Sequence, residues 1–251
     1  MFVPAHITGF FSIHIDREVL KTGSKGAGIT LNRGVKIEVK EGRGRIYYNN
    51  KKVDICPVKK LLPENFDLFL TSPFPLASGL GMSGASALGV AKLFYNNFLE
   101  KAHTSEVLCG TGLGDVIAQY VKGFVIRLKP GLPFKVLKIN VDKYVVVDVL
   151  GKMETREIIK DNIKKERINR VGERCLNELL KKPTIENFMK LSYRFALETG
   201  LMDDEIKEMC KTVKNSSQSM LGKTFFCVVD RDEIKEVCSI LNDPIICKVI
   251  N

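Results

Sequence analysis

A glycine-rich stretch that leads directly into an apolar helical run constrains this chain more than any other feature. Residues 75–87 read PLASGLGMSGASA, and the apolar run 88–99 follows them. Glycine lets a backbone approach a ligand closely because no Cβ stands in the way. The free N–H groups and the positive dipole end of the next helix face such a loop and favour an anion, most often a phosphate. The pattern therefore predicts a phosphate site, as in a nucleotide-using kinase.

Two other glycine motifs fit this chain less well. Residues 79–84 match the G-x-G-x-x-G dinucleotide fingerprint, whose first glycine follows a strand directly. Here eight residues that include two prolines separate Leu70 from Gly79. Gly222-Lys223-Thr224 resembles the end of a P-loop, but Ser217 stands where a glycine is required, which favours a loop leading into a strand. A tight turn without a ligand stays open for residues 79–84.

Length and composition indicate a globular protein. The 251 residues suit one large domain or two small ones, and 45% hydrophobic and 27% charged residues are ordinary for a soluble chain. No apolar run approaches the roughly 20 residues of a membrane span. The start, Met1 to Pro4, lacks the features of a signal peptide. We therefore expect a cytoplasmic protein with no membrane partner.

The net charge of +10 raises the question of nucleic-acid binding. The lysines are spread along the chain, no RNA-binding aromatic pattern interleaves them, and tryptophan is absent. We therefore expect no nucleic-acid partner, and a modest attraction for anionic substrates accounts for the charge.

The seven cysteines form no CxxC pair and no Cys/His cluster at zinc spacing. Several lie in apolar runs, and an odd count argues against a disulfide framework. We expect reduced core thiols. The cysteines are residues 56, 109, 175, 210, 227, 238 and 247.

Hydrophobic periodicity predicts an α+β chain in two parts. In the first part we expect strands at 10–15, 35–39, 45–48, 66–70, 124–128 and 136–141, and helices at 85–100 and 116–121. In the second we expect a strand at 144–150, a charged helix over 154–182, helices begun by Pro183-Thr184 and Asp203-Asp204, a polar loop at 215–219, and β-α-β elements at 224–229, 231–241 and 245–250. The predicted domains are 1–142 and 143–251.

Two stretches resemble the GHMP kinases. Residues 75–87 are similar to the phosphate-loop motif of that superfamily, with Met82-Ser83-Gly84 in place of the usual serine pair. Residues 112–123 resemble its second motif, a glycine-flanked aspartate that opens a helix ending in glycine. The resemblance runs weakly over residues 4–228. It implies a two-domain GHMP kinase fold, with an S5 domain 2-like N-terminal ATP-binding domain and a ferredoxin-like C-terminal domain.

Within that superfamily, residues 2–11, 23–28 and 220–224 resemble the archaeal pantoate kinases. The general pattern has a lysine where His6 stands, followed by a Gly-Glu that is missing here. This resemblance implies ATP-dependent phosphorylation of pantoate to 4-phosphopantoate on the way to coenzyme A, with ATP and Mg²⁺ as cofactors. A homodimer is one expected assembly. The alternatives are another GHMP alcohol kinase, acting on mevalonate, homoserine or a sugar, and a non-catalytic nucleic-acid binder.

The resemblance also implies roles for single residues. Ser83 and Glu106 would hold Mg²⁺, and Asp115 would accept or orient the proton of the substrate hydroxyl. Plain helix caps for Ser83 and Asp115, and a first-turn glutamate for Glu106, stay open as alternatives. The ATP phosphates would lie on the loop residues Pro75, Ser78, Gly79, Leu80, Gly81, Met82, Ser83, Gly84 and Ala85.

An arginine within an apolar strand is the candidate for binding the substrate carboxylate. Arg127 interrupts the run 124–128, and an arginine in such a place needs a partner. Its forked guanidinium matches the geometry of a carboxylate. An outward-facing strand position is the alternative. We expect Ser24, His103 and His6 as further substrate contacts.

Overall fold

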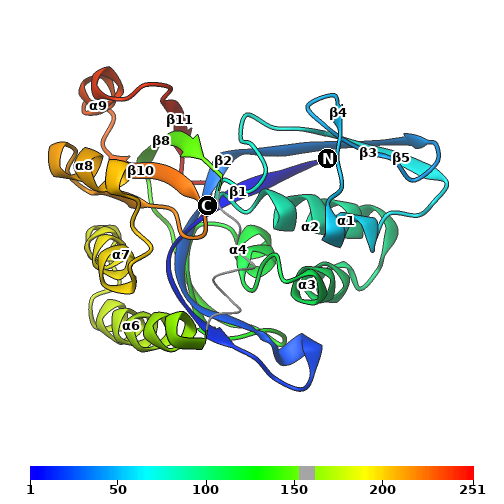
Figure 1. Cartoon of the computed structure of the whole chain (residues 1–251), viewed down its shortest axis with the longest axis horizontal. Coiled ribbons are helices and arrows are strands. Elements are labelled where there is room, and N and C mark those ends of the chain that lie inside the picture. Colours follow the sequence, from blue (N-terminus) through cyan, green and yellow to red (C-terminus); the bar gives the residue numbers. More distant parts are fainter. Residues whose placement is uncertain (153–161) are drawn as a thin grey trace.

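The structure is a computed structural model that describes residues 1–152 and 162–251. Its first half is built on a seven-stranded sheet in the order β4-β3-β5-β2-β6-β7, with β1 paired to β2 (Figure 1). β3 and β5 pair in parallel, and the other pairs of this sheet are antiparallel. The strands are β1 (Phe2–His14), β2 (Gly23–Glu41), β3 (Ile46–Tyr48), β4 (Lys51–Lys52), β5 (Phe66–Thr71), β6 (Phe124–Lys129) and β7 (Lys135–Ile139).

Four α-helices and a short 3-10 turn accompany this sheet. They are η1 (Val19–Lys21), α1 (Cys56–Lys59), α2 (Met82–Phe94), α3 (Phe98–Cys109) and α4 (Asp115–Val121). α2 packs closely on the sheet, because a Cβ added at Gly89 would collide with the side chain of Ile37. The helix is apolar nearly all round and buried from Ala85 to Ala91, as its sequence requires.

The second half contains a four-stranded antiparallel sheet in the order β11-β8-β10-β9. Numbered along the chain this order is 4-1-3-2, which is the ferredoxin-like arrangement, and it confirms the predicted α+β fold. The strands are β8 (Tyr144–Gly151), β9 (Ser216–Gln218), β10 (Lys223–Val229) and β11 (Ile245–Lys248). The helices are α6 (Asn162–Lys181), α7 (Ile185–Thr199), α8 (Asp204–Thr212) and α9 (Ile234–Ile240).

The two halves share one hydrophobic core. The ring centroid of Phe188 in α7 lies 6.3 Å from the ring centroid of Phe10 and 5.1 Å from that of Phe124. The N–H of Ile250 donates to the carbonyl of Thr30, which ties the end of the chain to β2. The chain passes between the sheets after Ile139 and before Tyr144, and the domain boundary at residue 142 stays a prediction.

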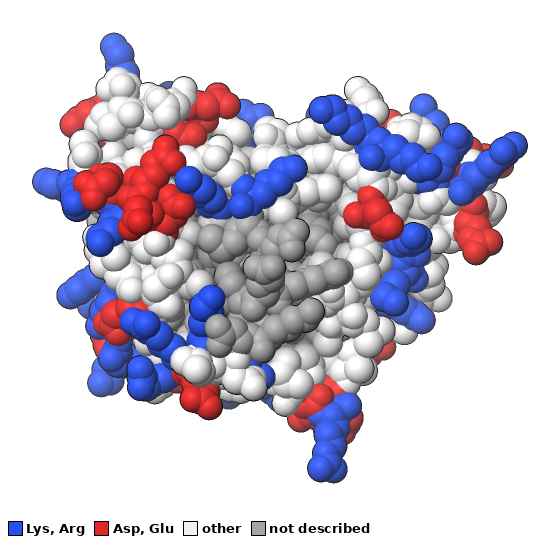
Figure 2. All heavy atoms as spheres, in the orientation of Figure 1, with Lys and Arg blue, Asp and Glu red and all other residues white. Residues whose placement is uncertain are grey.

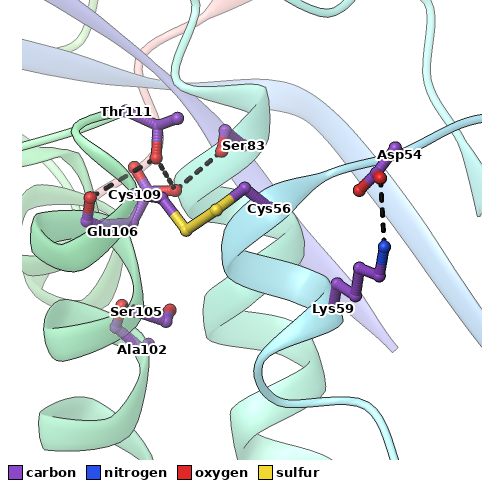
Figure 3. The surroundings of a disulfide bond; sticks show 9 residues. All are labelled: Asp54, Cys56, Lys59, Ser83, Ala102, Ser105, Glu106, Cys109 and Thr111. Atoms are coloured by element: carbon purple, nitrogen blue, oxygen red, sulfur yellow. Dashed lines mark hydrogen bonds and ion pairs between the residues drawn. A yellow bond between two sulfur atoms is a disulfide. The ribbon is translucent and has the colours of Figure 1, made fainter.

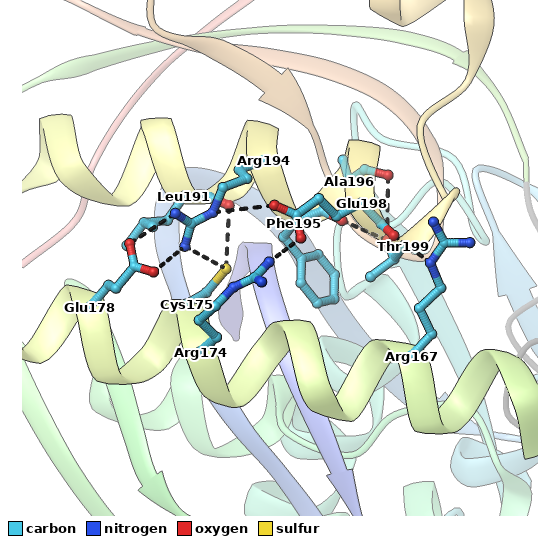
Figure 4. Close-up of polar contacts among 10 residues, drawn as sticks. All are labelled: Arg167, Arg174, Cys175, Glu178, Leu191, Arg194, Phe195, Ala196, Glu198 and Thr199. Atoms are coloured by element: carbon cyan, nitrogen blue, oxygen red, sulfur yellow. Dashed lines mark hydrogen bonds and ion pairs between the residues drawn. The ribbon is translucent and has the colours of Figure 1, made fainter.

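Helices α6 and α7 form an antiparallel pair that packs on β1. Arg194 of α7 forms a 2.8 Å ion pair with Glu178 of α6, and Arg174 of α6 pairs with Glu198 of α7 (Figure 4). A Cβ added at Gly172 of α6 would collide with the carbonyl of Phe11, so this helix lies against the backbone of β1. Because Phe11 also lines the cleft described below, the pair supports one wall of the site.

The structure corrects four of the predicted elements. One is the strand expected at 35–39, which is the later part of β2 (Gly23–Glu41). The helix expected over 85–100 is two helices, because Tyr95 is extended at φ −135° and the two asparagines after it are poor helix formers. The loop expected at 215–219 contains strand β9, which pairs with β10. The first strand spans β1 rather than 10–15. The helix expected over 154–182 corresponds to α6, which is described from Asn162 to Lys181. Residues 154–161 lie outside the described residues. No described helix is long and apolar enough to cross a membrane.

A disulfide joins α1 to the end of α3. Cys56 and Cys109 are bonded, so the prediction of reduced thiols is wrong for this pair (Figure 3). Sequence spacing gave no sign of the bond, because 53 residues separate the two cysteines and tertiary packing alone brings them together. The remaining cysteines are free. Three of them are buried and two partly exposed, namely 175, 227 and 247, and 210 and 238.

Reduction of this disulfide is expected to lower the free energy of unfolding by about 2–4 kcal/mol, because the bond restricts a long loop of the unfolded chain. Thermal unfolding with and without dithiothreitol checks this expectation. Cys56→Ser should behave like the reduced protein in both conditions. Cys238→Ser, which removes a partly exposed free thiol, should leave the response to dithiothreitol intact. Equal melting temperatures with and without dithiothreitol would contradict the expectation.

Candidate active site

A cleft opens where the loop before α2, the loop before α4 and the central strands meet. The segment between β9 and β10 closes one side of it. It is lined by Thr8, Phe11, Ser24, residues 77–83, residues 111–115, Arg127, Met220 and Leu221. Both glycine-rich motifs therefore line one cleft, together with Arg127, the residue predicted to bind the substrate carboxylate.

The loop of residues 75–85, called the phosphate loop from here on, needs glycine at two places. Gly79 and Gly81 have φ values of +83° and +67°, a left-handed conformation in which side chains are strained. A Cβ added at Gly79 would also lie 2.8 Å from the Cα of Gly222. The loop therefore packs backbone to backbone on the segment between β9 and β10.

Two hydroxyl groups from the second half of the chain fasten the phosphate loop. Ser219 Oγ donates to the Gly79 carbonyl and Thr224 Oγ1 to the Ser78 carbonyl, each at 2.6 Å. The sequence patterns predict no role for Ser219, and for residues 222–224 they favour a loop that leads into a strand. The signal that could have found Ser219 is the run of serines at 216, 217 and 219, which lie in β9 or directly after it and are all buried.

The helix α2 offers free backbone N–H groups to the cleft. Gly81 is the N-cap residue of α2, and no side chain of the described residues caps the helix, so the donors of its first turn are left for a ligand. Ser83 does not cap the helix. Its hydroxyl donates to the Glu106 carboxylate at 2.7 Å.

Not every residue of the phosphate loop reaches the cleft. The carbonyl of Pro75 accepts a 2.8 Å hydrogen bond from Ser78 Oγ, which stabilises the turn of the loop, and Pro75 does not line the cleft. Gly84 packs against α4, and Ala85 is fully buried. Residues 78–83 are the predicted phosphate-binding residues that line the cleft.

Glu106 is a buried carboxyl group with one free oxygen. It lies in the last turn of α3, so the first-turn alternative is wrong, and it is 2% exposed. Its Oε1 accepts from Ser83 and, at 3.0 Å, from Thr111, whereas Oε2 has no partner within the described residues (Figure 3). Burial raises the pKa of Glu106 to about 7 against the opposing effect of the Ser83 hydrogen bond.

A carboxylate and a hydroxyl group suit Mg²⁺ in a kinase. Mg²⁺ prefers oxygen ligands and is usually held by one or two carboxylates together with substrate phosphates. Among residues 1–152 and 162–251, no group of three or more His, Cys, Asp and Glu side chains forms a complete metal cage. The free Glu106 oxygen beside Ser83, at the N-terminus of α2, fits this incomplete kind of site.

Asp115 opens α4 and lies against two side chains of β1. Its Oδ1 lies 2.7 Å from His6 Nδ1 and accepts a longer 3.4 Å hydrogen bond from Thr8. His6 and Thr8 face the same way because side chains two apart on a strand share a face. The Asp115 side chain is 26% exposed and lines the cleft, whereas His6 is buried behind it. The structure thus places His6 on Asp115 rather than among the lining residues where a substrate contact was expected.

Charges around Asp115 keep it ionised. Burial favours a higher pKa for Asp115, but the His6 hydrogen bond and the nearby Arg127 charge outweigh it, so the pKa lies below its usual value. Burial lowers the pKa of His6, which is therefore neutral near pH 7. A neutral His6 donates its Nδ1 proton to the carboxylate, as the contact requires.

Arg127 supplies a buried positive charge at the same cleft. It lies on β6 opposite Gly26 and is 1% exposed. Its Nη2 donates to Ser24 Oγ at 3.4 Å, while Nε and Nη1 have no partner in the part of the chain that the structure describes. Burial lowers its pKa to about 10, which still leaves it charged near pH 7. Unpaired donors of a buried cation fit an anionic group of a ligand.

His103 is not brought to the cleft. It is 1% exposed, and its Nε2 lies 2.9 Å from the Thr22 carbonyl just before β2. Burial lowers its pKa, so this ring is a neutral donor to the backbone. His103 therefore does not line the cleft, and the substrate contact expected from it is not formed there.

Comparison with solved structures defines the class of protein. A mevalonate kinase from Methanococcus jannaschii has the same fold, with a TM-score of 0.68, 18% identity, and coverage of 100% of this chain and 98% of that chain. A protein described as a phosphotransferase related to the CoA biosynthesis pathway superposes with a TM-score of 0.85 at 31% identity, over 99% of this chain and 94% of the other. The fold is that of the GHMP kinases.

Sequence comparison narrows the class. No protein-family model matches the chain. The chain is 53% identical over 99% of its length to pantoate kinase of Methanocaldococcus jannaschii, and the match covers 99% of that protein. It is 34% identical over 96% of its length to pantoate kinase of Thermococcus kodakarensis, with 91% of that protein covered. The chain belongs to the pantoate kinase family.

Proposed function

We propose that this protein transfers the γ-phosphoryl group of ATP to the terminal hydroxyl of pantoate, giving 4-phosphopantoate for coenzyme A biosynthesis. The observation that carries the proposal is the placement of Asp115 and Arg127 on one cleft beside the phosphate loop. An acceptor with a hydroxyl at one end and a carboxylate at the other matches this pair. The names of the curated relatives support the same substrate.

The side chains divide the work of phosphoryl transfer, which needs positioning and charge neutralisation more than covalent help. In the proposal, Arg127 and Ser24 bind the pantoate carboxylate and set the distance of its hydroxyl from Asp115. Asp115, held by His6 and Thr8, accepts the hydroxyl proton as the oxygen attacks phosphorus. The backbone N–H groups at the start of α2 bind the phosphates of ATP.

In the proposal, Ser83 Oγ and the Glu106 carboxylate hold Mg²⁺. When bound there, the ion neutralises the charge that develops on the transferred phosphoryl group. The hydrogen bond between Ser83 and Glu106 keeps both ligands together in the absence of the ion.

The dependence on Mg²⁺ is expected to be sensitive to pH near neutrality. Because the pKa of Glu106 is about 7, its carboxyl group is mostly protonated below that pH, and a proton must leave before the ion binds. The apparent affinity for Mg²⁺ should fall by about tenfold per pH unit below pH ~7 and level off above it. Magnesium titrations of kcat between pH ~6 and ~8, corrected for protonation of ATP, measure this dependence.

Glu106→Gln is the control for the titration. It should bind Mg²⁺ weakly at every pH and show a flat profile, because the amide has no proton to lose. A wild-type affinity that does not vary with pH would contradict the role of Glu106.

A coupled assay of ADP release tests the proposed function. Purified protein is incubated with Mg²⁺-ATP and one of pantoate, pantothenate, mevalonate, homoserine or glycerate. Turnover with pantoate alone supports the proposal, and mass spectrometry then locates the phosphate on the terminal oxygen. Turnover with another alcohol in place of pantoate would keep the kinase and overturn the substrate.

The charge on one face of the molecule is mixed, which gives no support to nucleic-acid binding at that face. On the face shown in Figure 2, basic side chains gather over the β3–β5 end and acidic ones over α8, so positive charge does not cover that face. We propose that the protein is a cytoplasmic enzyme without nucleic-acid or membrane partners, as the sequence predicts. The predicted homodimer is checked by light scattering of the purified protein.

A further inference from the structure

Gln119 lies on α4 one helical turn after Asp115 and faces the phosphate loop. Its Nε2 donates to the Gly81 carbonyl at 2.7 Å, and the side chain is 1% exposed. Residues four apart share a helix face. A Cβ added at Gly81 would accordingly lie 2.8 Å from Gln119 Nε2 and 3.4 Å from the Asp115 Cβ. One face of α4 therefore presents both the proposed base and a donor bonded to the phosphate loop.

The bonded carbonyl controls a backbone donor of the loop. The peptide unit is planar, so the Gly81 carbonyl and the N–H of Met82 belong to one rigid group and point in opposite directions. The same carbonyl also accepts the first hydrogen bond of α2, from Ala85 N at 2.9 Å. Fixing the carbonyl therefore fixes the direction of the Met82 N–H, and Met82 lines the cleft.

The orientation of the Gln119 amide is determined by this contact. The Gly81 carbonyl accepts hydrogen bonds only, so the NH₂ group of Gln119 must face it. The amide oxygen, Oε1, is then buried and has no partner as far as the structure describes the chain. Leaving a buried acceptor unpaired costs free energy. The fold tolerates that cost here, which favours a role in the site over a role in stability.

We infer that Gln119 is a positioning residue that keeps the phosphate loop and the Asp115 carboxylate at a fixed separation. Phosphoryl transfer needs the attacking oxygen and the phosphorus in line, and a misplacement of about 1 Å can cost about 100-fold in rate. The inference rests on the proposed function, because it assigns the base to Asp115 and the phosphates to the loop. The pantoate carboxylate is bound elsewhere, at Arg127, so Gln119 should affect kcat and spare the KM for pantoate.

Two substitutions separate the hydrogen bond from the shape of the side chain. Gln119→Met keeps the length and removes the donor, and its kcat should fall about 10- to 100-fold at every pH, with KM for pantoate within about threefold. Gln119→Glu donates only when protonated. The ratio of its kcat to that of the wild type should therefore rise as the pH falls, whereas the ratio for Gln119→Met stays flat. A merely structural role predicts the same flat profile for both variants.

Ser192→Ala is the matched control. Ser192 is fully buried on α7 and donates to the Phe188 carbonyl at 2.7 Å, so the variant removes a similar buried hydrogen bond at residues that do not line the cleft. Its kcat should stay within about twofold of the wild type. A Gln119→Met variant with wild-type kcat, or one that loses no more than Ser192→Ala, would overturn the inference.

Hydrogen exchange of the backbone amides gives a measurement that does not require the enzyme to phosphorylate any substrate. The amides of residues 79–84 should exchange faster in Gln119→Met than in the wild type, and remain unchanged in Ser192→Ala. If the wild type fails to phosphorylate pantoate while the loop loses protection in Gln119→Met, the proposed function fails and the positioning of the loop stands. Unchanged exchange of the loop amides in Gln119→Met would refute the positioning itself.

Discussion

Replacing Asp115 with asparagine is expected to lower kcat by about 1000-fold and leave KM for ATP within about threefold. The amide has nearly the same size but cannot accept the hydroxyl proton. His6 and Thr8 hydrogen-bond to the carboxylate and hold it in place, and its lowered pKa keeps it ionised, so that it has a free charge with which to orient and accept the hydroxyl proton. Steady-state ADP release with pantoate at saturating ATP measures the effect.

Asp148→Asn is the control for this prediction. Asp148 is also a buried aspartate, 3% exposed, but it lies on β8 and accepts a 3.1 Å hydrogen bond from the backbone of Asn242. The variant should keep kcat within about threefold, since an amide oxygen can still accept that bond. An Asp115→Asn enzyme that turns over as fast as Asp148→Asn would remove Asp115 from the proton transfer.

Arg127→Met is expected to raise KM for pantoate by about 100- to 1000-fold and to stabilise the folded protein. Charge-assisted hydrogen bonds contribute about 1.5–3 kcal/mol each, and tenfold corresponds to about 1.4 kcal/mol. Two guanidinium nitrogens of Arg127 are buried without a partner in the residues described, so an apolar side chain relieves a desolvation cost. We expect the free energy of unfolding to rise by about 1–3 kcal/mol.

Two further variants complete this experiment, which combines initial rates against pantoate with thermal unfolding. Arg127→Lys keeps the charge but loses the fork, so its KM should lie between those of the wild type and Arg127→Met. Arg45→Met removes a surface arginine paired with the buried Asp67, so it should lower stability and leave KM unchanged. A wild-type KM for Arg127→Met would refute the carboxylate site.

The local sequence predicted the parts of the site that depend on neighbouring residues. The glycine-rich run indicated a loop with unusual backbone freedom, and Gly79 and Gly81 are indeed left-handed. The glycines around Asp115 indicated a second helix that begins there, which is α4. Arg127 was singled out because an arginine in an apolar strand is unusual, and it is indeed buried. These features follow from backbone freedom, helix termini and the cost of burying charge, which act over a few residues.

Contacts between distant segments required the tertiary structure. His6 lies against Asp115 across 109 residues of sequence, and Ser219 fastens Gly79 across 140. The disulfide between Cys56 and Cys109, which are 53 residues apart, is of the same kind.

The sequence by itself therefore determined a glycine-rich loop that leads into a helix, a family of kinases and most of the candidate residues. The tertiary structure decided which of those side chains meet. His6 lies behind Asp115, His103 lies outside the cleft against the backbone of Thr22, and Gln119 is hydrogen-bonded to the phosphate loop. The physical reason is that local periodicity specifies which face of an element is buried, whereas the partner on that face depends on how all the elements pack.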